Sequence, residues 1–200
     1  MLDADFFRRW MTAAAAAVDR EAERLTALDS PIGDADHGSN LQRGFAAVVA
    51  ALEKEAPATP GAVLQLAGRQ LISTVGGASG PLYGTLLRRT GKTLGTDAAE
   101  VGEERLREAL RAGVAAVATL GGAAPGDKTM LDALVPAVDA LGESFAAAAD
   151  AAERGAEATT PLRARKGRAS YLGERSVGHR DPGATSAALL VAALAEAADV

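Results

Sequence analysis

DSPIGDADHGSN, residues 29–40, is the stretch around which the rest of the chain is arranged. It holds three carboxylates, Asp29, Asp34 and Asp36, within eight residues, and one of the two histidines of the chain. Carboxylates this close together repel one another unless a cation lies between them. Their oxygen atoms suit a hard cation such as Mg²⁺ rather than Zn²⁺. The stretch therefore predicts a magnesium site in a loop between two helices.

The last residues of this stretch, from Gly38 to Asn40, open a helix. The N–H groups and the dipole at a helix N-terminus favour a phosphate, so metal and phosphate beside one loop indicate a Mg-nucleotide site. Aspartate, glycine and asparagine are also ordinary turn and capping residues, which is the simpler interpretation of any one of them. An EF-hand does not fit, because its sixth position would be Ser39 instead of glycine and its twelfth Phe45 instead of glutamate.

Helical periodicity lies on both sides of this loop. A first helix is predicted over residues 3–28, capped by Asp3, with one apolar stripe formed by Phe7, Met11, Ala14, Val18, Ala22, Leu25 and Leu28. Downstream, the pattern predicts helices over about 38–55 and 60–74, one ending near 94, helices over about 98–120 and 129–141, one ending near 160, and a last helix from Asp181 to about 198. Residues 160–182 show no helical periodicity, and no strand is predicted. We expect a single domain over residues 1–200, an all-α antiparallel bundle or barrel of eight helices.

The composition supports helices and narrows the function. Hydrophobic residues make up 48% of the chain and aromatic residues 4%, so alanine and leucine dominate the packing. The net charge of −5 argues against nucleic acid as the main partner. Without cysteine, disulfides and thiolate metal sites are excluded, which is compatible with the cytoplasm. Arg8-Arg9 and the apolar run after it resemble a secretion signal, but Asp3 and Asp5 and the continuing helical pattern indicate a mature helix, and no run is long enough to span a membrane.

Other irregular segments could serve a nucleotide. The glycines of residues 76–80 would let the backbone approach a phosphate, although a plain interhelical turn needs the same residues. No P-loop is present at Lys92 or at Lys128, the two candidate lysines. Asp127 separates Gly126 from Lys128, and no strand is predicted before either lysine. Thr129 and Met130 could contact a nucleotide or serve as cap and core. Arginines of the long loop could hold phosphate oxygens or simply lie on the surface: Arg168, Arg175 and Arg180.

Four of these segments together resemble the ADP-binding L subunits of bacterial phosphotransferase-dependent dihydroxyacetone kinases. The matching stretches are DSPIGDADHGSN at 29–40, GGASGPLYG at 76–84, PGDKTMLDAL at 125–134 and GRASYLGERSVGHRDPGATS at 167–186. The resemblance implies an eight-helix antiparallel barrel with the nucleotide at one end. It implies that two Mg²⁺ ions are held by Asp29, Asp34 and Asp36, and that residues 160–182 cover the site.

The resemblance also implies the nucleotide contacts. Those at the phosphates would be His37, Gly38, Ser39 and Asn40, and those of the wrapping loop Ala78 and Ser79. The adenine side would be Gly121, Thr129 and Met130, and the closing residues Arg168, Asp181, Pro182 and Gly183. No residue of this chain would be phosphorylated, since bound ADP would accept a phosphoryl group from a phosphohistidine on an M subunit. The resulting ATP would phosphorylate dihydroxyacetone bound covalently to a K subunit.

Two alternatives stay open from the sequence. The first is an ATP-dependent kinase subunit of the same fold, which would exchange ATP and serve a related ketose. The second is a non-catalytic helical barrel that binds a lipid, with the three aspartates as a structural metal site. The sequence decides neither between these nor between a monomer and a homodimer.

Overall fold

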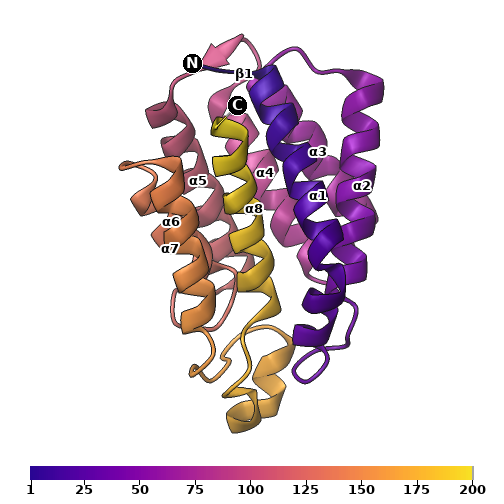
Figure 1. Cartoon of the computed structure of the whole chain (residues 1–200), viewed down its shortest axis with the longest axis vertical. Helices are drawn as coiled ribbons and strands as arrows, with labels where there is room; N and C mark the ends of the chain where they lie inside the picture. Colours follow the sequence, from indigo (N-terminus) through magenta and orange to yellow (C-terminus); the bar gives the residue numbers. More distant parts are fainter. Residues whose placement is uncertain (200) are drawn as a thin grey trace.

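The computed structural model describes residues 1–199, which form an up-and-down arrangement of helices around one core (Figure 1). The helices are α1 (Ala4–Asp29), α2 (His37–Glu55), α3 (Pro60–Thr74), α4 (Ser79–Leu94), α5 (Glu103–Gly121), α6 (Leu131–Ala140), α7 (Phe145–Ala158) and α8 (Pro182–Ala198). Successive helices pack against one another, and α8 packs against both α7 and α1, which closes the ring. The predicted all-α antiparallel barrel is therefore confirmed.

Two short segments differ from the prediction. β1 (Leu2–Asp3) pairs antiparallel with β2 (Glu100–Val101), where the sequence predicted no strand and a helix already begun at 98. The pairing buries Leu2 and Val101 at the end of the barrel, and α5 begins only after Gly102. A pairing of two residues on each side leaves no alternating pattern in the sequence, so periodicity could not reveal it.

The segment between α7 and α8, residues 160–180, is here called the cover segment. It contains η1 (Arg168–Ser176), a 3-10 helix that is interrupted at Gly173, where φ is 56°. The sequence predicted only an irregular loop here. A short, kinked 3-10 helix makes i→i+3 bonds and has no stripe of period 3.6, which explains why no helix was predicted. In Figure 1 the cover segment lies at the lower end of the barrel, away from both chain termini.

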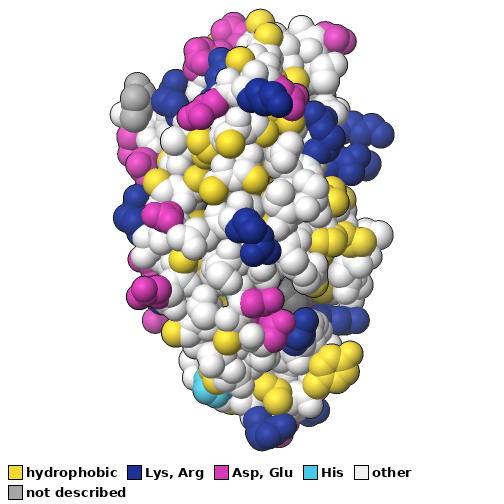
Figure 2. Space-filling view, turned by 90° about the vertical axis from the view of Figure 1, so that its right-hand side faces the viewer, with side chains coloured by type: hydrophobic (Ala, Val, Ile, Leu, Met, Phe, Trp, Pro, Cys, Tyr) yellow, Lys and Arg dark blue, Asp and Glu magenta, His cyan; other side chains and the backbone are white. Residues whose placement is uncertain are grey.

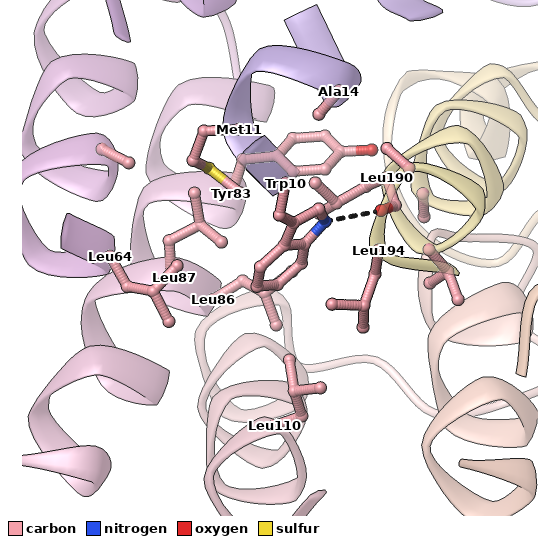
Figure 3. Close-up of a cluster of buried hydrophobic side chains, with 14 of the residues drawn as sticks. Trp10, Met11, Ala14, Leu64, Tyr83, Leu86, Leu87, Leu110, Leu190 and Leu194 are labelled. Atoms are coloured by element: carbon pink, nitrogen blue, oxygen red, sulfur yellow. Dashed lines mark hydrogen bonds between the residues drawn. The ribbon is translucent and has the colours of Figure 1, made fainter. Parts of the chain in front are cut away.

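The core is built from leucine, alanine and a few aromatic side chains (Figure 3). Trp10 is 1% exposed, and its Nε1 donates to the carbonyl of Leu190 at 2.9 Å, which joins the first helix to the last. Helices α3 and α4 approach closely through glycines: a Cβ on Gly68 would lie 2.7 Å from the carbonyl oxygen of Gly84. Small residues thus let the helices close the ring with few large side chains.

A small cavity in the barrel interior, among Trp10, Leu110 and Leu194, has a volume of about 20 Å³. That is room for on the order of one water molecule. Across residues 1–199, no helix combines the length and the apolar character that crossing a bilayer requires.

Candidate functional site

A cavity of about 510 Å³ opens at the end of the barrel where α1, α3, α5 and α7 finish. Its lining comes from four connections, the residues after α1, after α3, after α5 and after α7, together with the first turns of the helices that follow them. Figure 2 shows acidic and basic side chains next to one another in the lower half of the molecule, toward this end. The size suits a small-molecule ligand.

Three carboxylates meet at one side of this cavity. Oxygens of Asp29, Asp34 and Asp36 lie within 4.8 Å of one another. Asp29, the last residue of α1, is buried and accepts hydrogen bonds from the backbone N–H groups of Asp36 at 3.1 Å and of His37 at 3.4 Å. These bonds fold the loop back onto the helix end, which is what brings the three side chains together.

The loop needs glycine at one position to fold this way. A Cβ on Gly33 would lie 1.8 Å from an Asp29 carboxylate oxygen, so no side chain fits there. Ala35 has a φ of 59°, a conformation that non-glycine residues rarely adopt. A donor set of only oxygens, drawn together by a tight loop, matches a hard divalent cation. The residues present therefore fit Mg²⁺.

Two helices begin at the cavity without a side-chain cap. Neither Asp36 before α2 nor Ala78 before α4 makes a side-chain cap hydrogen bond. Residues 76–79 and Asn40 line the cavity beside these helix ends. Helix N-termini carry unpaired N–H groups and a partial positive charge, so this side of the cavity suits phosphate oxygens.

A chain of hydrogen bonds runs from the cavity into the core through His37. Ser79 Oγ lies 3.3 Å from Nδ1 of His37, and Nε2 of the same ring lies 2.9 Å from Ser186 Oγ. Ser186 Oγ is in turn 2.6 Å from the hydroxyl of Tyr83 and donates to the carbonyl of Gly183 at 3.1 Å. When Ser186 Oγ uses its proton on the Gly183 carbonyl, it accepts from Tyr83 and from Nε2–H of His37, and in that arrangement Nδ1 of His37 accepts from Ser79.

Burial sets the protonation states of the residues in this hydrogen-bonded series. Burial lowers the pKa of His37, although the carboxylates of Asp29 and Asp36 act in the opposite direction. Burial also raises the pKa of Tyr83 far above its ordinary value, so its hydroxyl stays protonated. The side chains in this hydrogen-bonded series are therefore neutral. Their hydrogen bonds hold the His37 ring in one orientation beside the carboxylates.

The N-terminus of α8 forms another wall of the cavity. Asp181, 8% exposed, caps this helix by accepting from the N–H of Ala184 at 2.7 Å. Burial raises the pKa of Asp181 to about 7, although the hydrogen bond from Ala184 and the charge of Lys128 act in the opposite direction. Pro182 and Gly183 follow it along the cavity wall.

The opposite wall is less polar and comes from the end of α5 and the loop before α6. Gly121, Thr129 and Met130 line it, with Leu120 at its edge. Asp132 holds the loop in place by accepting from the N–H groups of Gly126 at 2.5 Å and Thr129 at 2.7 Å. This wall can accept the flat, partly apolar face of a base.

The cover segment completes the cavity. Its residues Lys166, Gly167, Arg168 and Ala169 line it. Arg168 forms an ion pair with Asp34 at 2.9 Å, and Ile32 of the carboxylate loop packs with Ala164 and Ala169. The cover segment therefore contacts the loop that carries the three carboxylates.

The structure brings most of the predicted site residues to this one cavity. It is lined by Asp29, Asp34, Asp36, His37, Asn40, Ala78, Ser79, Gly121, Thr129, Met130, Arg168, Asp181, Pro182 and Gly183. Gly38 and Ser39 do not line it. Gly38 faces α1, where a Cβ would lie 1.9 Å from the carbonyl oxygen of Ala22, and the hydroxyl of Ser39 donates to the carbonyl of Asp36 at 3.0 Å.

Three further residues were not singled out from the sequence as site residues. Tyr83 lies four positions after Ser79 on α4, and Ser186 lies three after Gly183 on α8, so helical spacing could have placed both near the cavity. Lys128 gave no such signal. It is 1% exposed, and burial lowers its pKa while Asp181 acts against that shift.

Comparison with known proteins places these features in one family. A model of the DAK2 domain matches residues 31–196. The "PEP-dependent dihydroxyacetone kinase, ADP-binding subunit DhaL" of Escherichia coli K12 is 46% identical over 200 residues, and the alignment covers 94% of each chain. The "L-erythrulose 1-kinase" of Mycolicibacterium smegmatis is 42% identical over 189 residues, which are 89% of this chain but 33% of that enzyme.

Solved structures agree. The crystal structure of the dihydroxyacetone kinase of C. freundii in complex with AMP-PNP and Mg²⁺ has a TM-score of 0.74 and 30% identity, over 98% of this chain and 33% of that one. Its native form gives a TM-score of 0.75 and 31% identity. The chain thus corresponds to about one third of that kinase and to nearly the whole length of the E. coli subunit.

Proposed function

The chain belongs to the DAK2 domain family, and on that premise we propose that it is the ADP-binding subunit of a phosphoenolpyruvate-dependent dihydroxyacetone kinase. One observation carries the proposal: three carboxylates converge at a cavity into which two helices point uncapped N-termini. Such a cavity can hold the two parts of a Mg-nucleotide, the cation on the carboxylates and the phosphates at the helix ends.

In this proposal the residues of this chain bind and orient the Mg-nucleotide. Asp29, Asp34 and Asp36 would hold two Mg²⁺ ions, which when bound neutralise charge on the transferred phosphoryl group. The N–H groups in the first turns of α2 and α4 other than that of His37, which donates to Asp29, would hold the phosphates together with Asn40 and Ser79. His37, kept neutral and fixed by Ser186, would position Ser79 by accepting a hydrogen bond from its hydroxyl group.

The remaining walls would select the base and exclude water. Thr129 and Met130, with Gly121 beside them, would face the adenine. Arg168 and the first residues of α8 would close the cavity from the side of the cover segment. Phosphoryl transfer depends mainly on positioning and charge neutralisation, so a subunit that supplies both needs no nucleophile of its own.

The proposal assigns two partners. The phosphoryl donor would be a phosphohistidine on an M subunit, and the acceptor dihydroxyacetone on a K subunit, both in the cytoplasm. The E. coli ADP-binding subunit, itself a separate subunit, is matched over 94% of its length, whereas the erythrulose kinase extends far beyond the matching part. Whether two copies of this chain associate is left to measurement.

The content of the purified protein tests the proposal. The protein is prepared without added nucleotide and denatured, and the released nucleotide is identified by chromatography while magnesium is quantified. We expect nearly one ADP per chain and about two Mg²⁺ per ADP. Protein that arrives empty and binds ATP reversibly would favour the ATP-dependent alternative instead, and protein that ignores both nucleotides with Mg²⁺ would refute the kinase assignment.

The lipid-binding alternative has less support. The cavity among Trp10, Leu110 and Leu194 in the barrel interior is far too small for an acyl chain. The larger cavity lies at the barrel end and is lined by carboxylates and helix N-termini, which suit anions and cations rather than hydrocarbon.

A further inference from the structure

Lys128 is a buried lysine whose ammonium group contacts the cover segment. Its side chain is 1% exposed, and Nζ donates to the carbonyl of Leu162 at 3.0 Å and to the carbonyl of Ser176 at 2.7 Å. A buried ammonium needs such acceptors, since it has lost its hydration. Leu162 lies before the part of the cover segment that lines the cavity, and Ser176 lies after it. A single side chain therefore holds both limbs of the cover segment, the stretch before this lining part and the stretch after it.

The backbone at Lys128 is unusual as well. Its φ is 64°, in the left-handed region that glycine adopts easily and lysine rarely. Residues persist in that region where the surrounding contacts hold them there. The neighbouring Asp127 adds a second attachment, because its carbonyl accepts from the N–H of Arg165 at 3.1 Å. The loop before α6 is therefore joined to the cover segment at two consecutive residues.

The limbs that Lys128 holds are also joined to each other. Ser176 Oγ accepts from the N–H of Ala164 at 2.9 Å, and the N–H of Gly178 donates to the carbonyl of Thr160 at 2.8 Å. The part between the limbs, including Gly167 and Arg168, lines the cavity. The place of this lining thus depends on the base of the cover segment, and Lys128 is an attachment from outside the segment that a side-chain substitution can remove without touching the carboxylates.

We propose that Lys128 is a positioning residue that fastens the cover segment over the cavity and thereby slows release of the ligand. The occupant, a nucleoside diphosphate with Mg²⁺, rests on the proposed function, but the fastening does not. Lys128 acts through the cover segment and takes no part in the transfer itself.

Trypsin can report the fastening directly. The cover segment carries six cleavage positions, after Arg163, Arg165, Lys166, Arg168, Arg175 and Arg180. Site-resolved cleavage is followed by mass spectrometry in the wild type, in Lys128→Met and in the control Lys92→Met, which removes an exposed lysine at the other end of the barrel. We expect cleavage in the cover segment to be at least tenfold faster in Lys128→Met only, with unchanged cleavage after Arg105 and Arg111 of α5.

Ligand release is the second readout. A fluorescent N-methylanthraniloyl-ADP, bound with Mg²⁺, is displaced by excess ADP, and its dissociation rate is recorded. We expect at least tenfold faster release from Lys128→Met, wild-type release from Lys92→Met, and slow release restored in part by Lys128→Arg, which keeps the charge and the donors.

The outcomes separate the two proposals. Wild-type cleavage and release in Lys128→Met would overturn the role of Lys128, and so would cleavage that accelerates equally in α5 and in the cover segment. If Lys128→Met does not fold, Lys128→Gln, whose shorter amide cannot reach both carbonyls, carries the same test with the same overturning results. Failure of the wild type, first freed of any resident nucleotide, to bind the fluorescent ADP with Mg²⁺ would refute the proposed function, while the cleavage experiment would still decide the fastening.

Discussion

The two ends of the barrel differ in how the unpaired N–H groups at the helix starts are satisfied. At the end with the chain termini, the first N–H groups of α1, α3 and α7 are capped by side chains of Asp3, Thr59 and Ser144. At the cavity end, the N-cap residues of α2 and α4 make no side-chain cap hydrogen bond, whereas α8 is capped by Asp181; among the described helices of the opposite end only α5 lacks a side-chain cap. An uncapped helix end is costly unless water or a ligand satisfies it. The uncapped starts of α2 and α4 lie beside the three carboxylates, where a phosphate can satisfy their N–H groups.

Buried charge follows the same division. Among residues 1–199, the charged side chains buried to below a tenth exposure are Asp29, Lys128 and Asp181, and all three lie at the cavity end. Burial of a charge destabilises a fold unless it is paired or hydrogen-bonded. All three are hydrogen-bonded, but at Asp181 the hydrogen bond does not make up for the lost hydration, since the pKa of its carboxyl group is raised, so the cavity end gives up stability at that residue. Three substitutions test this contrast, in order of decreasing effect.

Asp34→Ala should have the largest effect. It removes one of the three carboxylates that converge at the cavity, so affinity for ADP in the presence of Mg²⁺ should fall by about 100-fold or more, the order expected when a metal ligand is lost. The helical fold should stay, because Asp34 is exposed. Isothermal titration with ADP and Mg²⁺ measures this. Asp97→Ala, which removes an exposed carboxylate at the other end, is the matched control, and equal affinities of the two variants would contradict the metal site.

Asp181→Asn should have an intermediate, pH-dependent effect. Burial raises the pKa of Asp181 to about 7, so the native state binds its proton more tightly than the unfolded state. Stability of the wild type is therefore lost as the pH rises from about 4 to about 7, and asparagine, an equally good cap, avoids this loss. Without ligand, the variant should be more stable by about 2–4 kcal/mol at pH 8 and by almost nothing at pH 4.

Urea unfolding at several pH values measures this difference. Asp3→Asn makes the same chemical change at the exposed cap of α1 and is the control. A pH-dependent gain of equal size in both variants would show that burial at the cavity end is not the cause.

Asp3→Ala should have the smallest effect. The side chain of Asp3 accepts from the N–H of Phe6 at 2.8 Å, and losing a cap of this kind costs about 1 kcal/mol of unfolding free energy. Thermal unfolding measures the loss. Affinity for ADP and Mg²⁺ should not change, because the cavity lies at the other end of the barrel. Weaker binding of ADP and Mg²⁺ by Asp3→Ala, at unchanged stability, would contradict the conclusion that the two ends of the barrel act independently.

The sequence predicted best what depends on neighbours along the chain. The cap at Asp3, the start of the last helix at Asp181, the bounds of the helix starting at Pro60, and the convergence of Asp29, Asp34 and Asp36 all arise within a few residues. What joins distant parts left no local pattern. His37 meets Ser186 across 149 positions, and Lys128 meets backbone carbonyls, which are present at every residue and carry no sequence signal.

Both described ends of the chain lie at the barrel end opposite the cavity (Figure 1). A domain with this layout can be joined to another polypeptide at either terminus without blocking its ligand. The longer relatives, in which the matching part makes up about a third of the enzyme, show that nature has made such fusions. For this chain, the same layout offers two attachment points for tags, surfaces or reporter proteins that leave the cavity open.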